Sequence, residues 1–260
     1  MLKRRLIPKL QLGLRKSFRG AQPVLVVTRQ FGNRRAIGNP LSQAKIYEAQ
    51  LADELILVDL ERTEESWPVL LDTVEAVAEA LATPLAVGGG VHSLDQVQAL
   101  LDRGADKVVL NSAPLEQPEL INRVANAYGA QCLVLSLDVR PDTDGGWRVW
   151  SHGGKLDAGR EALSWACEAV DRGAGEVMVT AIERDGTAEG IDLALTAALT
   201  EPLVVPVIAS GGVGNPNHMT DGILKGKASA VLVASIFHFG EYTIPETKQV
   251  MKDAGIPVRL

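Results

Sequence analysis

The chain has 260 residues, of which 46% are hydrophobic and 22% charged, and its formal net charge at pH 7 is −6. This length suits one large domain or two small ones. No apolar run approaches the roughly 18 residues that span a bilayer, so we expect no membrane segment. Two cysteines exclude a disulfide framework, and the four histidines lack the spacing of a helical metal site. We therefore expect neither a metal nor a cofactor.

Charge is distributed unevenly along the chain. The first 47 residues contain eleven Lys or Arg and no Asp or Glu, whereas the remainder has fifteen basic and thirty-two acidic residues. Such a start is typical of an organelle transit peptide, of a nucleic-acid patch, or of an anion-binding segment in an acidic protein. A first strand over residues 6–12 argues against the transit peptide. Aromatic residues are sparse, with only Phe18 and Phe31 near the basic residues of positions 15–35, and this argues against nucleic acid.

In chain order, eight short apolar runs rich in β-branched residues are predicted to be strands: residues 6–12, 54–60, 84–87, 107–110, 132–139, 176–182, 205–209 and 230–234. Amphipathic stretches such as 93–105 and 160–174 lie between them and predict helices. Strands buried on both faces and separated by helices pair in parallel. Eight such units predict an α/β protein, a (β/α)8 TIM barrel that forms a single domain over residues 1–260.

Two blocks of sequence recur at one spacing. "ADELILVDLER" (52–62) aligns without gaps with "AGEVMVTAIER" (174–184), and residues 89–110 align at the same offset with 211–232. A common offset close to half the chain length predicts two similar half-barrels. At a slightly longer offset, "LQL" (10–12) corresponds to "LDV" (137–139), so Gln11 takes in one half the place of Asp138 in the other. We expect both side chains to project inward at the carboxyl ends of their strands, where barrel enzymes place their chemistry.

Two glycine-rich turns are also related by the repeat. "VGGGVHS" (87–93) and "ASGGVG" (209–214) each end a strand and open a helix. Glycines there let backbone amides approach an anion, although glycine also serves tight turns without a ligand. Two equivalent turns, at Gly89 and Gly90 and at Gly211 and Gly212, predict a substrate with a phosphate at each end.

Polar and small residues follow other strands at the same rim. Asn111, Ala234 and Ser235 follow strands four and eight, and Asp185 and Thr187 follow strand six. Asp59 ends strand two, where a carboxylate can bind a hydroxyl group, transfer a proton, or cap the next helix.

Several motifs together resemble the cyclase subunit of imidazole glycerol phosphate synthase (HisF) over essentially the whole chain: "GGGVHS", "RGADKVVLNSA", "SLDVR", "RGAGEVMVTAIERDGT", "IASGGVG" and "SIFHF". The resemblance implies a cytoplasmic heterodimer with a HisH-like glutaminase docked at the amino-terminal face of the barrel. Ammonia from that partner would pass along the barrel axis to a diphosphorylated substrate at the opposite face.

The resemblance also implies roles for single residues. Asp138 matches one of two catalytic aspartates of the family. The phosphate-site segments of the family are matched by Gly90, Asn111, Asp185, Thr187, Gly212, Ala234 and Ser235. The charged gate that the family has at the base of the barrel is matched by Arg5, Glu54, Lys107 and Glu176. These four charges can equally be a stabilising ring of ion pairs, because buried charges must be paired.

The chain departs from the family pattern at strand one. Gln11 stands at the other catalytic aspartate, and an amide cannot exchange a proton at neutral pH. Lys9 stands where cysteine is common, and can contact substrate phosphate, narrow the ammonia path, or pair with Asp138 or Asp59. The following segment is expected to be a long basic loop that closes over an anionic substrate, with these residues: Arg15, Lys16, Arg19, Arg29, Arg34 and Arg35.

Four functions remain open from the sequence. The favoured one is a HisF-like synthase subunit that uses ammonia on another phosphorylated or nucleotide-sugar substrate, as in surface polysaccharide (lipopolysaccharide) biosynthesis. The second is a true cyclase of histidine biosynthesis, with Asp59 replacing the missing carboxylate. The third is a catalytically silent, anion-binding scaffold for a glutaminase. A related sugar-phosphate isomerase is the fourth, and Gln11 argues against it because it too needs two carboxylates.

Overall fold

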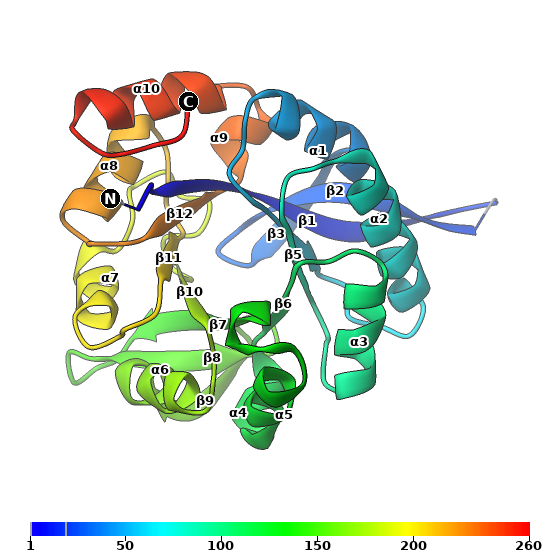
Figure 1. Ribbon diagram of the computed structural model, residues 1–260, viewed down its shortest axis with the longest axis horizontal. Coiled ribbons are helices and arrows are strands. Elements are labelled where there is room, and N and C mark those ends of the chain that lie inside the picture. The colour runs from blue at the N-terminus through cyan, green and yellow to red at the C-terminus, as the bar shows by residue number, and fades with distance from the viewer. Residues whose placement is uncertain (1, 19) are drawn as a thin grey trace.

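The computed structural model describes residues 2–18 and 20–260, which form a closed barrel of eight parallel strands inside a ring of helices (Figure 1). Pairing of β10 with β7 completes the closure. The barrel strands are β1 (Arg5–Ser17), β4 (Leu55–Asp59), β5 (Leu85–Gly88), β6 (Lys107–Leu110), β7 (Leu133–Pro141), β10 (Glu176–Ala181), β11 (Val207–Ser210) and β12 (Ala230–Val233). The predicted TIM barrel is confirmed, and each predicted strand lies on one of these.

Helices cover the outside of the barrel. They are α1 (Pro40–Ala49), α2 (Ser66–Ala80), α3 (Leu94–Asp102), α4 (Ser112–Glu116), α5 (Glu119–Tyr128), α6 (Ala162–Asp171), α7 (Leu193–Thr200), α8 (Pro216–Leu224), α9 (Ser235–His238) and α10 (Ile244–Asp253), with a 3-10 turn over Ala130–Cys132. Caps repeat between the halves: Ser93 begins α3 and Asn215 begins α8, each accepting a backbone amide with its side-chain oxygen. Within the described residues, no helix is long and apolar enough to cross a membrane.

The barrel has two apolar cores. A small one fills its axis, and every barrel strand contributes to it: Ile7, Ile56, Ala86, Val109, Val134, Met178, Ile208, Ala230 and Leu232. A larger one lies between the strands and the outer helices. Because each strand is buried on both faces, its sequence is a continuous apolar run rather than an alternating one. The packed axis divides the interior into an amino-terminal end and a carboxyl-terminal mouth.

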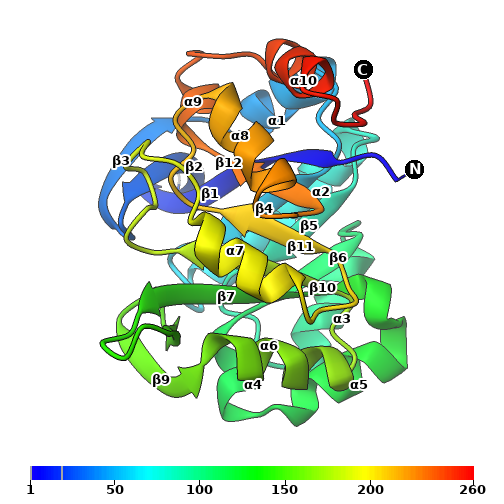
Figure 2. The same ribbon diagram turned by 90° about the vertical axis from the view of Figure 1, so that its left-hand side faces the viewer.

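Two hairpins were not predicted from the sequence. The first comprises β2 (Gly20–Arg29) and β3 (Gly32–Gly38) and continues from β1. The second comprises β8 (Trp147–Ser151) and β9 (Leu156–Glu161) and continues from β7. Figure 2 shows β3 and β9 at one end of the barrel and the N-terminus at the other.

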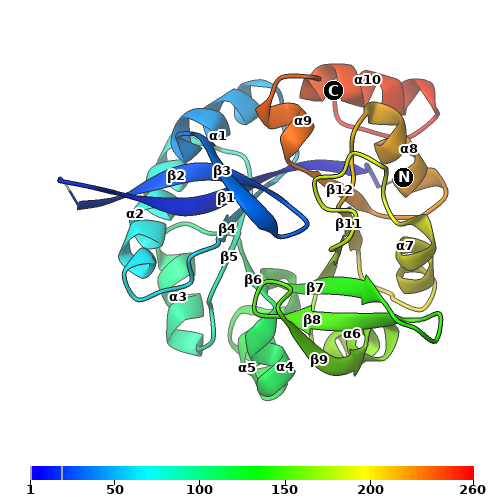
Figure 3. The same ribbon diagram turned by 180° about the vertical axis from the view of Figure 1, so that it is seen from behind.

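The prediction of a long basic loop after strand one was therefore wrong, because most of this segment forms strands. It is a ribbon in which β2 pairs antiparallel with β1, from Gln11 opposite Val26 to Ser17 opposite Gly20. This ribbon projects well beyond the helices (Figure 3). Lys16 pairs with Glu65 at 2.8 Å, and Arg34 with Glu61 at 3.0 Å. Arg19 lies outside the described residues.

Candidate active site

Two cavities open at the carboxyl ends of the barrel strands, and Lys9, Gln11 and Thr28 line both. The larger has a volume of about 630 Å³ and the smaller about 30 Å³. Predicted site residues that also line the larger cavity are Gly89, Gly90, Asn111 and Asp138. Those that also line the smaller one are Asp185, Gly211, Gly212, Ala234 and Ser235. The two halves of the barrel therefore contribute separate parts of one mouth, divided by strand β1 and the β2–β3 hairpin.

Asp138 lies near the end of β7, opposite Thr180 of β10, and lines the larger cavity. Asn111 donates from Nδ2 to Oδ2 of Asp138 at 3.1 Å and to the carbonyl of Ser136 at 3.0 Å. Burial raises the pKa of Asp138 to about 6, against the opposing charges of Lys9 and Arg62. A carboxyl group with this pKa exchanges protons readily near neutral pH, which suits general acid–base chemistry.

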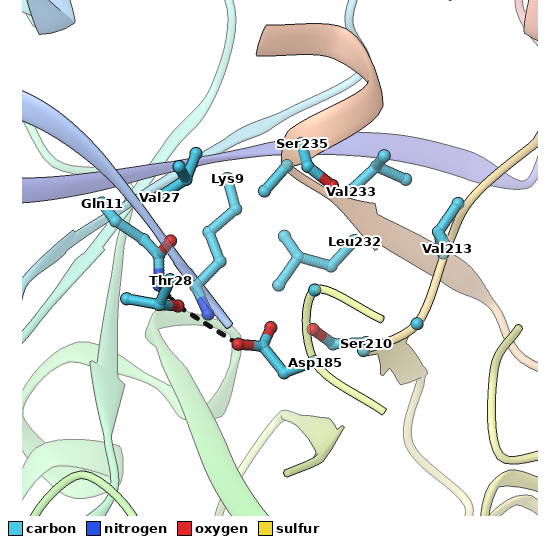
Figure 4. A pocket seen from close by; sticks show the side chains of 14 residues that line it. Lys9, Gln11, Val27, Thr28, Asp185, Ser210, Val213, Leu232, Val233 and Ser235 are labelled. Carbon is cyan, nitrogen blue, oxygen red and sulfur yellow. Dashed lines mark hydrogen bonds between the residues drawn. The ribbon is translucent and has the colours of Figure 1, made fainter. Parts of the chain in front are cut away.

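Gln11 belongs to a chain of side-chain hydrogen bonds (Figure 4). Its Nε2 donates to Oγ1 of Thr28 at 3.2 Å, and Thr28 donates to Oδ2 of Asp185 at 3.1 Å. The backbone N–H of Gln30 also donates to the backbone carbonyl of Asp185, at 2.8 Å. Gln11 thus ties β1 to Thr28 of the β2–β3 hairpin, and Thr28 and Gln30 tie the hairpin to the loop after β10, beside the smaller cavity.

Lys9 is 8% exposed, and its side chain enters the barrel mouth (Figure 4). One of the three alternatives for Lys9, an ion pair with Asp138 or Asp59, is not formed: among the described residues no carboxylate oxygen lies within 4 Å of its ammonium. Its backbone carbonyl accepts a hydrogen bond from Nε2 of His238 at 3.0 Å. Because that carbonyl only accepts, Nδ1 of His238 is the acceptor for the hydroxyl of Tyr47, at 2.7 Å. Burial lowers the pKa of His238 to about 4, so the imidazole is neutral and holds β1 in place.

Asp59 and Thr187 line neither cavity in the described part of the chain. The buried carboxylate of Asp59 accepts from the amides of Glu61 and Arg62 and from Oγ of Ser66, at 2.9, 3.0 and 2.6 Å. These bonds hold the turn between β4 and α2; the helix cap expected as one role of Asp59 is not formed, because the N-cap of α2 is Glu65, whose side chain makes no capping hydrogen bond. The hydroxyl of Thr187 donates to the carbonyl of Arg184 at 2.8 Å and so holds the turn after β10.

The two glycine turns have the same conformation. Gly89 and Gly211 have φ of +108° and +97°. A Cβ at Gly89 would lie 2.2 Å from the carbonyl oxygen of Asp59, and one at Gly211 would lie 2.8 Å from that of Ala181. Asp59 and Ala181 are themselves related by the repeat. Tight packing therefore requires glycine here, and the same turns leave the cavity walls without side chains, open to an anion.

A ring of four charges lies at the opposite end of the barrel. Glu54 accepts from Arg5 at 2.5 Å and from Lys107 at 2.9 Å, and Glu176 bonds with the same two cations. Burial opposes the charged form of Arg5, but the hydrogen bonds and charges of Glu176 and Glu54 raise its pKa above the usual value. The structure brings these four predicted residues together as a ring of ion pairs.

The comparison with protein families gives a match over residues 7–243 to the histidine biosynthesis protein family. The chain belongs to this family. A curated relative from Prochlorococcus marinus (strain MIT 9313) is 52% identical over 260 residues, covering 100% of this chain and 99% of the relative. That relative is described as "Putative imidazole glycerol phosphate synthase subunit hisF2". Membership agrees with the HisF resemblance of the motifs and with the closed barrel.

Among the cavity residues that sequence reasoning missed are Thr28, Arg62 and Lys155, which carry charge or hydrogen bonds. Thr28 and Lys155 come from the two unpredicted hairpins, so nothing placed them at the mouth. Arg62 had a signal, because the repeat aligns it with Arg184. Among the described residues, no group of three His, Cys, Asp or Glu side chains is arranged to hold a metal ion.

Proposed function

We propose that this chain is the ammonia-accepting synthase subunit of a HisF-like glutamine amidotransferase and acts on a phosphorylated small molecule other than the substrate of the histidine-pathway cyclase. The observation that carries this proposal is that the barrel mouth has a carboxyl group on β7, at Asp138, and an amide at the equivalent position of β1, Gln11. Asp138 has a pKa suited to proton transfer, whereas Gln11 is engaged in hydrogen bonds to the hairpin. A reaction that needs one carboxyl group rather than two fits this arrangement.

The two glycine turns support a phosphorylated substrate. Each leaves a wall of backbone at the mouth, one beside the cavity of about 630 Å³. Asn111, which orients Asp138, lies next to the first turn in the same cavity, so a phosphate held there would bring its substrate to the carboxyl group. Nucleotide sugars of surface polysaccharide biosynthesis are the substrate class that we favour.

The ring at the amino-terminal end supports a glutaminase partner. Arg5, Glu54, Lys107 and Glu176 surround the barrel axis, and the two carboxylates are 3% and 7% exposed. We propose that a HisH-like subunit docks at this face and that the ring controls ammonia entering the barrel. The heterodimer would work in the cytoplasm, where glutamine is available.

Two other functions are separable by experiment. A true histidine-pathway cyclase would have to replace the carboxyl group absent at position 11, whereas Asp59 lines neither cavity and its carboxylate accepts three hydrogen bonds from its own turn and from Ser66. A silent scaffold would need no proton donor, so it does not account for the pKa of Asp138.

The test supplies excess ammonium and phosphoribulosyl-formimino-aminoimidazole carboxamide ribotide, the histidine-pathway substrate, so that no glutaminase is needed. We expect no turnover by the parent chain and measurable turnover by Gln11→Asp, with Gln11→Glu as a control of the same charge but greater length. Robust turnover by the parent would overturn the proposal in favour of a true cyclase. Turnover by neither would leave the proposed chemistry intact only if the parent still binds phosphate at the mouth.

A further inference from the structure

The larger cavity has more positive charge than its own carboxylates neutralise. Four Lys or Arg side chains line it: Lys9, Arg34, Arg62 and Lys155. Arg34 is neutralised by Glu61 at 3.0 Å. In the described part of the chain, the other three make no ion pair within 4 Å. The remaining carboxylates on the wall are Asp138 and Glu116, and Glu116 lies at the rim, 3.7 Å from Nε2 of His152.

Lys9 is the deepest of these cations. It is 8% exposed, and no described residue accepts a hydrogen bond from its ammonium. Its ammonium nitrogen is not sealed from solvent, so the charge reaches the open cavity, where an anion can contact it. Lys9 and Arg62 both act on Asp138, whose pKa their charges lower, so both lie close to that carboxyl group. The cavity thus presents two unpartnered cations beside the expected site of reaction.

Arg62 is held over the cavity by its backbone. Its φ is +56°, a left-handed conformation that is strained for any residue except glycine. The carboxylate of Asp59 maintains it by accepting the amide of Arg62 at 3.0 Å. The side chain runs between Gly90 and Gly153: added Cβ atoms there would lie 3.1 Å from Cβ and 2.7 Å from Nη2 of Arg62. In the described chain, no residue accepts a hydrogen bond from its guanidinium.

The repeat supplies an internal comparison. Arg184 holds the equivalent place in the other half: a Cβ at Gly212 would lie 3.1 Å from Cβ of Arg184, matching Gly90 and Arg62. Arg184, however, donates from Nη1 to the carbonyl of Glu189 at 3.3 Å. One arginine therefore supports its own loop, whereas the guanidinium of the other faces the cavity with all its donors unused. Loop structure alone does not explain Arg62.

We infer that Lys9 and Arg62 form a third anion-binding point, beside Asp138 and distinct from both glycine turns. Its ligand is a carboxylate or phosphate close to the reacting centre of the substrate. This inference rests on the proposed function, because it takes the first glycine turn as the site of a substrate phosphate. The substrate therefore carries a carboxylate or a second phosphate in addition to the phosphate at the first glycine turn.

The test compares three probes of one carbon skeleton by isothermal titration calorimetry with the full chain: 6-phosphogluconate, glucitol 6-phosphate and glucitol 1,6-bisphosphate. We expect the carboxylate or the second phosphate to tighten binding about tenfold or more over glucitol 6-phosphate, as charge-assisted hydrogen bonds do. Whichever of the two binds more tightly identifies the anion. Arg62→Gln should remove most of this preference, and Lys9→Met the rest, while inorganic phosphate still binds.

Arg184→Gln is the matched control, because it alters the repeat-related arginine and should leave the preference ratio unchanged. Equal binding of all three probes would overturn the inference while leaving the glycine-turn site standing. A preference that survives Arg62→Gln would overturn it too. If neither inorganic phosphate nor any probe binds, both the inference and the phosphate site of the proposed function are wrong. Arg62 is exposed, so its replacement is not expected to impair folding.

Discussion

Replacing Asp138 by Asn should make the folded chain more stable at pH 8 and no more stable at pH 4. Burial raises the pKa of Asp138 from 3.8 to about 6, so ionising it is harder in the folded state than in the unfolded state. The folded state therefore loses stability as pH rises from about 4 to about 6, and the loss is complete above that range. Asn cannot ionise, has nearly the same shape, and retains an oxygen that accepts the hydrogen bond from Asn111.

The expected gain follows from the two pKa values. A difference of about two pKa units corresponds to about 3 kcal/mol at pH 8. For a chain of 260 residues the entropy of unfolding is roughly 0.5 kcal/mol/K, so the melting temperature should rise by about 5 °C. At pH 4 the two proteins should melt within about 1 °C of each other. In any reaction that uses Asp138 as acid or base, the same change should lower the rate by about 10²- to 10⁴-fold.

Differential scanning calorimetry at pH 4, 6 and 8 measures this, with Asp144→Asn on the exposed loop between β7 and β8 as the control. A gain at pH 8 that is absent at pH 4 and absent from the control supports a carboxyl group kept in an unfavourable site for function. A loss of stability at pH 8, or an equal change at both pH values, would refute the reasoning, since ionised Asp138 would then be stabilising or irrelevant.

Three further predictions concern groups away from Asp138. Burial lowers the pKa of His238 to about 4, so the stability that its neutral form provides above pH 6.5 should be lost as pH falls toward 4, and NMR titration of the imidazole should show no protonation at pH 5.5. Glu176→Gln should weaken the bonds to Arg5 and Lys107 and lower the free energy of unfolding in urea by about 3 kcal/mol. Lys16→Gln, the control, breaks the exposed pair with Glu65 and should lower it by at most about 1 kcal/mol. Lys248→Met should leave the buried carboxylate of Asp53 with Arg259 as its one remaining ion-pair partner among the described residues and cost about 3 kcal/mol, and a loss no larger than that of Arg259→Met, whose side chain is 55% exposed, would contradict the role of burial.

The barrel could be predicted because its strands are short, buried on both faces and spaced by amphipathic helices. The internal repeat also showed that Glu54 is equivalent to Glu176 and Gly89 to Gly211 in the two halves of the barrel. The two hairpins could not be predicted in the same way. Residues 23–27 do form a partly buried apolar run, but they pair with β1 where it continues past the barrel, and residues 32–38 of β3 are exposed except Ile37, so no alternation marked that strand.

The contents of the site were predicted less completely than its location. Asp138, Gln11 and Lys9 lie at the mouth as expected, but Lys9 makes no ion pair and Asp59 holds a loop. Both outcomes depend on distances across the barrel that linear sequence does not contain. The engagement of Gln11 with Thr28 and Asp185 depends on the hairpin, so the role of residue 11 was visible only once the hairpin was placed.

The central claim is that this barrel transfers ammonia to a phosphorylated acceptor by means of Asp138. The most direct measurement adds the purified chain and ¹⁵N-ammonium to a lysate of its source cells from which the gene has been deleted, and follows phosphorylated metabolites by mass spectrometry. We predict that one phosphorylated species gains ¹⁵N with the parent chain and does not with Asp138→Asn. Incorporation that is equal with Asp138→Asn, or absent with a parent chain that still stimulates a glutaminase, would contradict the account and indicate a scaffold.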